Sequence, residues 1–236
     1  MATTATRVCL VTGVGAGNGA SLVRRFASAG YAVAMLARSE DQLRTLEREI
    51  RGARAYVTDV ADTEAVARTL ARVRDDLGPV TVLLHNAGSG AFAPFLDVTP
   101  EMFEAAWRVN ALALLALMRE TVPDMQRAGG GAIIVTGATA SLRGGPVTAA
   151  FAAAKAAQRS LAQSAARALG PQGIHVALVI VDGVIDMPRT RQFFGDRPDD
   201  FFLKPDAIAD TVYHLAHQDR SAWTFEVDLR PFGEKW

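Results

Sequence analysis

The sequence contains one cysteine, three tyrosines and no excess of charge of either sign. The single Cys9 excludes a disulfide framework and any zinc site built from several cysteines. The tyrosines are Tyr31, Tyr56 and Tyr213, so few positions could supply a phenolic acid or base. Twenty-five basic and twenty-five acidic side chains give a formal net charge of zero, which argues against nucleic acid as a partner.

Long hydrophobic runs are also missing. The run at residues 174–181 is far shorter than the roughly 20 residues needed to cross a bilayer, and residues 1–6 are too few and too polar for a signal peptide. We therefore expect a soluble cytoplasmic protein with no membrane partner. Half of the 236 residues are hydrophobic, which is enough for one sizeable core and argues against disorder.

Short apolar runs alternate with helical patterns along the chain. Strands are expected at residues 7–12, 31–36, 53–57, 80–85, 132–136, 174–181 and 223–229. Helices are expected at residues 16–29, 40–50, 63–77, 101–119, 147–169 and 205–216. Because the strands are continuous apolar runs, both faces of each strand should be covered. This predicts one α/β domain over residues 1–236, with a doubly wound, Rossmann-like parallel sheet.

Residues 187–204 interrupt the alternation. The segment carries Phe193, Phe194, Phe201 and Phe202 among arginine, aspartate and proline. An irregular insertion after the C-terminal end of a strand is where α/β proteins build lids. We expect this segment either to cover a small-molecule substrate with apolar groups or to pack in the ordinary way.

A glycine-rich loop follows the first expected strand. The glycines are Gly13, Gly15, Gly17 and Gly19. Such a loop permits a tight turn and a close approach of backbone to a pyrophosphate, and the next helix offers its N–H donors. The loop alone could be a plain turn, but its place in the first strand–helix unit favours dinucleotide binding.

Five motifs stand in order along the chain. They are T-G-x-x-x-G-x-G at residues 12–19, Asp59-Val60, Asn86-Ala87-Gly88, Asn110 and Lys155. Together they resemble the short-chain dehydrogenase/reductase family over essentially the whole chain. The resemblance implies hydride transfer between a nicotinamide cofactor and a carbonyl or alcohol, and a homodimer or homotetramer. The helices with Asn110 and Lys155 would form the interface, and Met102, Phe103 and Trp107 would lie in it or in the core.

The resemblance also implies cofactor contacts. Asp59 would accept a hydrogen bond from the adenine amino group beside Val60, unless Asp59 only caps a helix. The turn Asn86-Ala87-Gly88 would lie over a ribose, and Gly183 keeps the glycine of a Pro-Gly pair that the family has after the sixth strand.

Arg38 and Ser39 end the second strand, where relatives specific for NAD usually have an acid. An arginine and a hydroxyl suit a 2′-phosphate, which favours NADP(H) over NAD(H). The alternative for Arg38 is a solvated loop charge.

The catalytic positions implied by the resemblance are altered. The family has a tyrosine four residues before the lysine and a serine thirteen residues before that tyrosine. Phe151 and Ala138 stand there in this chain, while Asn110 and Lys155 remain. A phenyl ring has no ionisable proton and alanine has no hydroxyl. The chain therefore looks like an atypical member that lacks the catalytic tyrosine and serine.

Asp182 and Thr139 are the candidate substitutes for the missing acid. Asp182 takes the place of the proline in the Pro-Gly pair, and Thr139 follows the serine position. Asp186 lies close by in sequence, and a carboxyl group in an apolar pocket can act as an acid. The alternatives are an ordinary turn hydroxyl for Thr139, and loop capping or a salt bridge with Arg189 or Arg191 for the aspartates.

The four histidines lack metal-ligand spacing, so no metal site is expected. His85 should pack or hydrogen-bond in the turn before Asn86. Two functions remain open: an NADP(H)-dependent oxidoreductase with an unusual proton donor, or a cofactor-binding or regulatory protein that performs no redox step.

Overall fold

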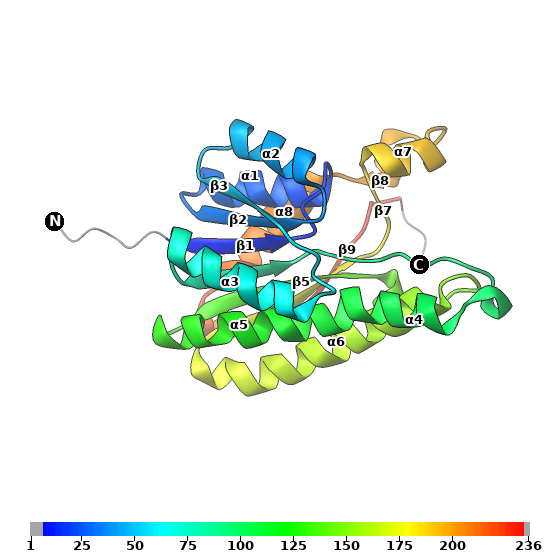
Figure 1. The fold of residues 1–236 in the computed structure, drawn as a ribbon. Coiled ribbons are helices and arrows are strands. Elements are labelled where there is room, and N and C mark those ends of the chain that lie inside the picture. The colour runs from blue at the N-terminus through cyan, green and yellow to red at the C-terminus, as the bar shows by residue number, and fades with distance from the viewer. Residues whose placement is uncertain (1–6, 234–236) are drawn as a thin grey trace.

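A seven-stranded parallel sheet forms the centre of the protein (Figure 1). The computed structural model describes residues 7–233. The strand order is β3-β2-β1-β4-β5-β6-β9, and every neighbouring pair is parallel. The strands are β1 (Val8–Thr12), β2 (Ala32–Ala37), β3 (Ala53–Val57), β4 (Val80–His85), β5 (Gly131–Ala138), β6 (Ile174–Val181) and β9 (Glu226–Leu229). The predicted doubly wound, Rossmann-like fold is confirmed.

Helices cover both faces of the sheet. One layer holds α1 (Asn18–Ser28), α2 (Glu40–Glu49) and α8 (Pro205–Ala216), and the other holds α3 (Thr63–Leu77), α4 (Pro100–Trp107), α5 (Ala113–Arg127) and α6 (Ala149–Leu169) (Figure 1). Each layer closes one hydrophobic core against the sheet. Within residues 7–233, none of these helices combines the length and the apolar character that a bilayer crossing requires.

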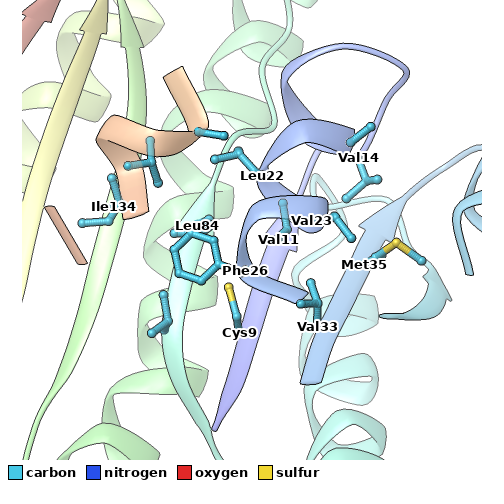
Figure 2. Close-up of a cluster of buried hydrophobic side chains, with 14 of the residues drawn as sticks. Cys9, Val11, Val14, Leu22, Val23, Phe26, Val33, Met35, Leu84 and Ile134 are labelled. Carbon is cyan, nitrogen blue, oxygen red and sulfur yellow. The ribbon is translucent and has the colours of Figure 1, made fainter. Parts of the chain in front are cut away.

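The core under α1 shows why the strands are apolar throughout. Along β1, Cys9 and Val11 face α1 (Figure 2). Val8 and Leu10 belong to the opposite core. Successive side chains of a strand point to opposite faces, so a strand covered on both sides needs apolar residues at every position. Phe26 of α1 is fully buried in this cluster, and its removal would cost about 3 to 5 kcal/mol of stability.

The helix predicted at residues 101–119 is longer and more divided than expected. It consists of α4, a π-helical turn (Arg108–Leu112) and α5, and it ends at Arg127. A proline usually ends or kinks a helix, yet α5 continues past Pro123. The reason is tertiary: the buried Asp124 carboxylate accepts from Arg74 at 3.0 Å and from the backbone N–H of Val80 at 3.2 Å, which fixes the last turn.

Two other predictions at the C-terminal side need correction. The segment expected to be irregular, residues 187–204, contains α7 (Pro188–Phe194) and β8 (Phe202–Leu203), and β8 pairs in parallel with β7 (Val184–Ile185) just before the segment. The last strand begins at Glu226 instead of residue 223, because Trp223 stacks on His175 with ring centroids 4.8 Å apart.

Candidate active site

The strand order reverses between β1 and β4, and the loops after these strands meet at the carboxyl edge of the sheet. Open α/β sheets bind ligands at such a switch point. The glycine loop after β1 lies directly against the end of β4. Gly13 has a φ of +68°, and a Cβ there would lie 2.5 Å from Cα of Ala87. Both the backbone angle and the space require glycine at this position.

The middle of the loop is open. An added Cβ at Gly15 would meet nothing within 4 Å, and Gly17 caps α1 without any side-chain hydrogen bond to the helix. The N–H of Ala20 donates to the carbonyl of Gly15 at 3.0 Å, which leaves the N–H groups of Asn18 and Gly19 to receive an anionic group at the positive end of the helix dipole. These residues fit the pyrophosphate of a dinucleotide. Met187 borders this opening, since its Cβ would lie 2.8 Å from a Cβ at Gly17.

Two asparagines fasten the loop to the end of β4. Asn18 donates to Oδ1 of Asn86 at 2.6 Å, and Asn86 donates to the carbonyl of Gly13 at 2.9 Å. Thr12 Oγ1 accepts from the backbone N–H of Ala87 at 3.2 Å. Asn18 was not among the predicted site residues; the signal was a polar residue between two glycines at the start of an apolar helix.

His85 lies fully buried at the end of β4, as the prediction of a structural role in the turn requires. Its Nδ1 is 3.1 Å from Thr12 Oγ1. Burial, with a smaller effect of the Lys155 charge, lowers the pKa of His85 to about 3. The imidazole is therefore neutral at physiological pH and cannot act as an acid there.

Lys155 and Asn110 come from α6 and the π-helical turn. Lys155 is buried, and its Nζ donates to the carbonyl of Thr136 at 2.9 Å and to Oε1 of Gln158 at 3.0 Å. Burial lowers the pKa of Lys155 to about 7. The amide of Asn110 donates to the carbonyl of Ala106 at 2.8 Å, whereas its buried Oδ1 accepts from no described residue.

These two side chains converge beside Gly88. A Cβ at Gly88 would lie 3.5 Å from Oδ1 of Asn110 and 3.7 Å from Nζ of Lys155. An unpartnered acceptor and an ammonium at one point can bind a hydroxyl group, which accepts and donates at once. The arrangement fits the ribose of a nucleotide.

Phe151 and Ala138 give the site no hydroxyl of their own. The Phe151 ring packs on Phe92 with centroids 5.5 Å apart, and Nζ of Lys155 is 5.9 Å from its centroid. The nearby Ser141 does not compensate, because its Oγ accepts from the backbone N–H of Ala138 at 3.1 Å and the side chain is buried.

Thr139 and Asp182, the two candidate substitutes, are in contact. The pairing of Ala138 with Val181 at the ends of β5 and β6 brings the following residues together. Thr139 Oγ1 donates to Oδ1 of Asp182 at 2.5 Å, and Oδ2 of Asp182 is 3.6 Å from Nη2 of Arg230. The two residues were predicted separately as candidates, and Arg230 was not predicted.

Asp186 does not join the Thr139–Asp182 pair, because its carboxylate is bonded to Arg191. Its carboxylate accepts two hydrogen bonds from Arg191, at 2.7 and 2.8 Å, which confirms the salt-bridge alternative. The guanidinium lowers the pKa of Asp186. Arg191 also contacts Asp199 at 2.9 Å and stacks 3.9 Å from the centroid of Phe202, so it joins both ends of the segment 187–204.

The residues predicted near the adenosine lie at the ends of β2 and β3. Arg38 and Ser39 are exposed, and Val60 is buried. Asp59 accepts from the backbone N–H of Ala61 at 3.0 Å, while Asp62 caps α3. The helix-cap alternative for Asp59 was therefore wrong.

At the opposite end of the crevice, Gly183 has a φ of +154°. A Cβ at this position would lie 2.8 Å from both Leu203 and Pro231, so the space also requires glycine.

Comparisons with known proteins agree with this geometry. The sequence model described as short chain dehydrogenase matches residues 7–196. L-xylulose reductase of Bos taurus is 30% identical over 92% of this chain and 91% of its own length. A short chain dehydrogenase of Pseudocercospora fijiensis is 33% identical, and the match spans 71% of this chain but only 56% of that protein.

Solved structures are similar over nearly the whole chain. A metagenomic short-chain oxidoreductase in complex with NADP has a TM-score of 0.82 and 32% identity, and the match covers 95% of this chain and 97% of that one. A short-chain dehydrogenase from Rhodopseudomonas palustris has a TM-score of 0.81 and 35% identity, with 96% and 99% of the two chains covered.

Proposed function

The chain belongs to the short-chain dehydrogenase family, and from this premise we propose that it is an NADP(H)-dependent oxidoreductase that uses an unusual proton donor. Its reaction interconverts a carbonyl and an alcohol. The observation that carries the proposal is the hydrogen-bonded pair Thr139–Asp182, placed where two neighbouring strands end at the crevice.

The cofactor would be held by groups along the whole crevice. The open glycine loop and the start of α1 would bind the pyrophosphate, and Lys155 with Asn110 would bind a ribose beside Gly88. Asp59 and Val60 would contact the adenine, and the exposed Arg38 and Ser39 would contact a 2′-phosphate. The similar metagenomic oxidoreductase was solved with NADP. A bound reduced nicotinamide would supply a hydride to the carbonyl carbon.

The proton would come from Asp182 through Thr139. In the structure the Thr139 hydroxyl donates to Asp182, so in the reducing direction Asp182 must first take up a proton and the Thr139 hydroxyl must turn toward the substrate oxygen. Thr139 would then give its hydroxyl proton to that oxygen and take the proton of Asp182. Asp182 is left as a carboxylate, with its Oδ2 3.6 Å from Nη2 of Arg230. The hydride supplies both electrons of the reduction, so the products are the alcohol and an ionised Asp182. In this scheme Lys155 would bind the ribose and would not transfer the proton.

The segment 187–204 would cover the substrate. Phe193 and Phe194 are 73% and 41% exposed, whereas Phe202 is buried under Arg191. Exposed aromatic rings next to a crevice suit a substrate with apolar groups.

Two copies of the chain would pair through α4, α5 and α6. Phe103 and Trp107 of α4 are 45% and 41% exposed, so they do not belong to the core of one chain. Large exposed apolar side chains of this kind are typical of interfaces.

The second candidate is a cofactor-binding or regulatory protein without redox activity. The packing of Phe151 on Phe92 favours it, because an apolar contact fills the position where the family has its tyrosine.

Turnover separates the two candidates. We expect the wild-type protein to oxidise NADPH with at least one compound of a panel of aldehydes, ketones, quinones and sugars that includes L-xylulose. The double variant Phe151→Tyr, Ala138→Ser restores the family residues and serves as the comparison. Turnover in the double variant alone would support the regulatory protein. Turnover in the wild type that Thr139→Val abolishes would support the oxidoreductase with the Thr139–Asp182 donor.

A further inference from the structure

Gln158 is a fully buried polar residue in the alanine-rich helix α6. Glutamine is mostly exposed in proteins, so its complete burial calls for polar partners. Its Oε1 accepts from Nζ of Lys155 at 3.0 Å, and its Nε2 donates to the backbone carbonyl of Asn110 at 2.8 Å. One amide thus connects the buried ammonium to the π-helical turn.

The hydrogen bonds of Lys155 leave a single donor for the crevice. An ammonium has three N–H groups. One donates to the carbonyl of Thr136 and one to Gln158. The third is available beside Gly88, where Oδ1 of Asn110 also lies. Gln158 therefore contributes the only side-chain oxygen bonded to Lys155 among residues 7–233.

No other titratable group near Lys155 takes over this role. His85 on β4 is neutral because burial lowers its pKa to about 3. Arg108 in the π-helical turn pairs with Glu104 at the surface. Asp182, after β6, is bonded to Thr139 and close to Arg230. On α6 itself, the next residue, Arg159, pairs with Glu226.

We propose that Gln158 is a positioning residue for Lys155: its amide oxygen stabilises the buried ammonium and keeps one N–H directed to the crevice beside Gly88. The neighbours on the interior side are carbonyl and amide oxygens, which accept hydrogen bonds without passing protons on. Lys155 therefore exchanges its proton only from the crevice side. What binds there rests on the proposed function, whereas the effect of Gln158 on Lys155 is a property of the cofactor-free protein.

Lysine-selective NMR can test this directly, because the chain has only three lysines, Lys155, Lys204 and Lys235. We propose to label lysine with ¹³C, to assign Lys155 with the variant Lys155→Met, and to titrate the cofactor-free protein. In Gln158→Leu the midpoint of Lys155 should fall by about one pH unit, since a hydrogen bond to the charged form is lost.

In Gln158→Glu the midpoint should rise by about one unit or more, because the amide oxygen becomes a carboxylate of nearly the same shape. Gln163→Leu is the matched control on the same helix, because the Gln163 side chain lies outside the site; it should leave the midpoint unchanged. A midpoint unchanged in both Gln158 variants would overturn the proposal. If Gln158→Leu does not fold, the Gln158→Glu titration decides the question in the same way.

Binding of NADPH gives an independent readout. Near pH 5 the ammonium is charged in wild type and in Gln158→Leu, so the two should bind alike. Near pH 8 the variant should bind several-fold more weakly, because less of its Lys155 is charged. A wild-type protein that binds no NADPH would refute the proposed function, while the NMR titration would still decide the role of Gln158.

Discussion

The crevice has two halves that are stabilised in different ways. The glycine half comprises the loop at residues 12–19 and the turn at residues 86–88, where the backbone at Gly13 packs so closely on Ala87 that no side chain fits and Asn86 bonds to the carbonyl of Gly13. The carboxyl half comprises Thr139, Phe151, Lys155 and Asp182, where the contacts are between side chains. The first half depends on steric fit and the second on which functional groups are present. The second can therefore change its chemistry while the fold stays the same.

The largest effect is expected from Asp182→Asn in the carboxyl half. An amide cannot supply the proton, so kcat for carbonyl reduction should fall by about 10² to 10⁴-fold, with little change in the affinity for NADPH. Steady-state kinetics and a binding titration measure the two quantities. Asp228→Asn is the matched control, because Asp228 also contacts Arg230, at 2.8 Å, but lies on the edge strand. Equal losses of kcat in both variants would show that the effect comes from the contacts of Arg230 and not from a proton supplied by Asp182.

Gly13→Ala should destabilise the glycine half and abolish its binding of the cofactor. The left-handed backbone costs about 1 to 2 kcal/mol and the clash with Ala87 about 1 to 3 kcal/mol. Chemical denaturation should show a matching loss of unfolding free energy, and NADPH binding should disappear. Gly170→Ala, far from the loop, is the control, since Gly170 has a φ of −52° and a Cβ there meets nothing within 4 Å. A stable Gly13→Ala protein that still binds NADPH would contradict this account of the loop.

The pH dependence of stability tests the buried His85. Its pKa is lower in the folded protein, about 3, than the ordinary value of 6.5, so the unfolded chain takes up the proton first as the pH falls. The contribution of His85 is therefore full above pH 6.5 and is lost progressively below it. By about pH 4.5 the loss should reach about 3 kcal/mol.

His85→Asn should flatten this part of the stability profile in urea unfolding experiments. His214→Asn, at an exposed histidine, should leave the profile as in the wild type. An identical slope in the wild type and in His85→Asn would show that another group causes the acid sensitivity.

The smallest effect is expected from Arg38→Ala. The exposed guanidinium would contact only the 2′-phosphate, so the affinity for NADPH should fall by about tenfold and that for NADH should hardly change. Fluorescence titration with both dinucleotides measures the ratio. Arg48→Ala removes an exposed charge from α2 and serves as the control. Equal weakening for both dinucleotides would argue against a phosphate contact.

The same division explains what the sequence could predict. The boundaries of β3, β4, β6, α3 and α8 were predicted to the residue, because apolar runs and helical spacing are local signals. The cap of α3 was not, since it is Asp62 and not Asp59. The glycine loop was also predictable from its spacing. The continuation of α5 past Pro123 was not, because it depends on Arg74 from a distant helix.

The hydrogen-bond partners of the side chains in the carboxyl half could not be predicted from the sequence. Thr139 and Asp182 are 43 positions apart and meet only through the pairing of β5 with β6. The role of Gln158 could not be predicted either, because it depends on the contact between α6 and the π-helical turn that brings Gln158 to the backbone carbonyl of Asn110. Such contacts depend on tertiary geometry that no local pattern contains.

The π-helical turn at Arg108–Leu112 changes which side of the continuous α4–α5 helix faces the sheet. Each residue advances a helix by about 100°, so one additional residue in a turn rotates everything after it by that angle. Before the turn, α4 packs on α6; after it, α5 packs on β4 and α3. Deleting a single residue here would turn the apolar side of α5 away from the sheet, whereas an insertion in a surface loop would be absorbed. The helix therefore tolerates changes of residue type far better than changes of length.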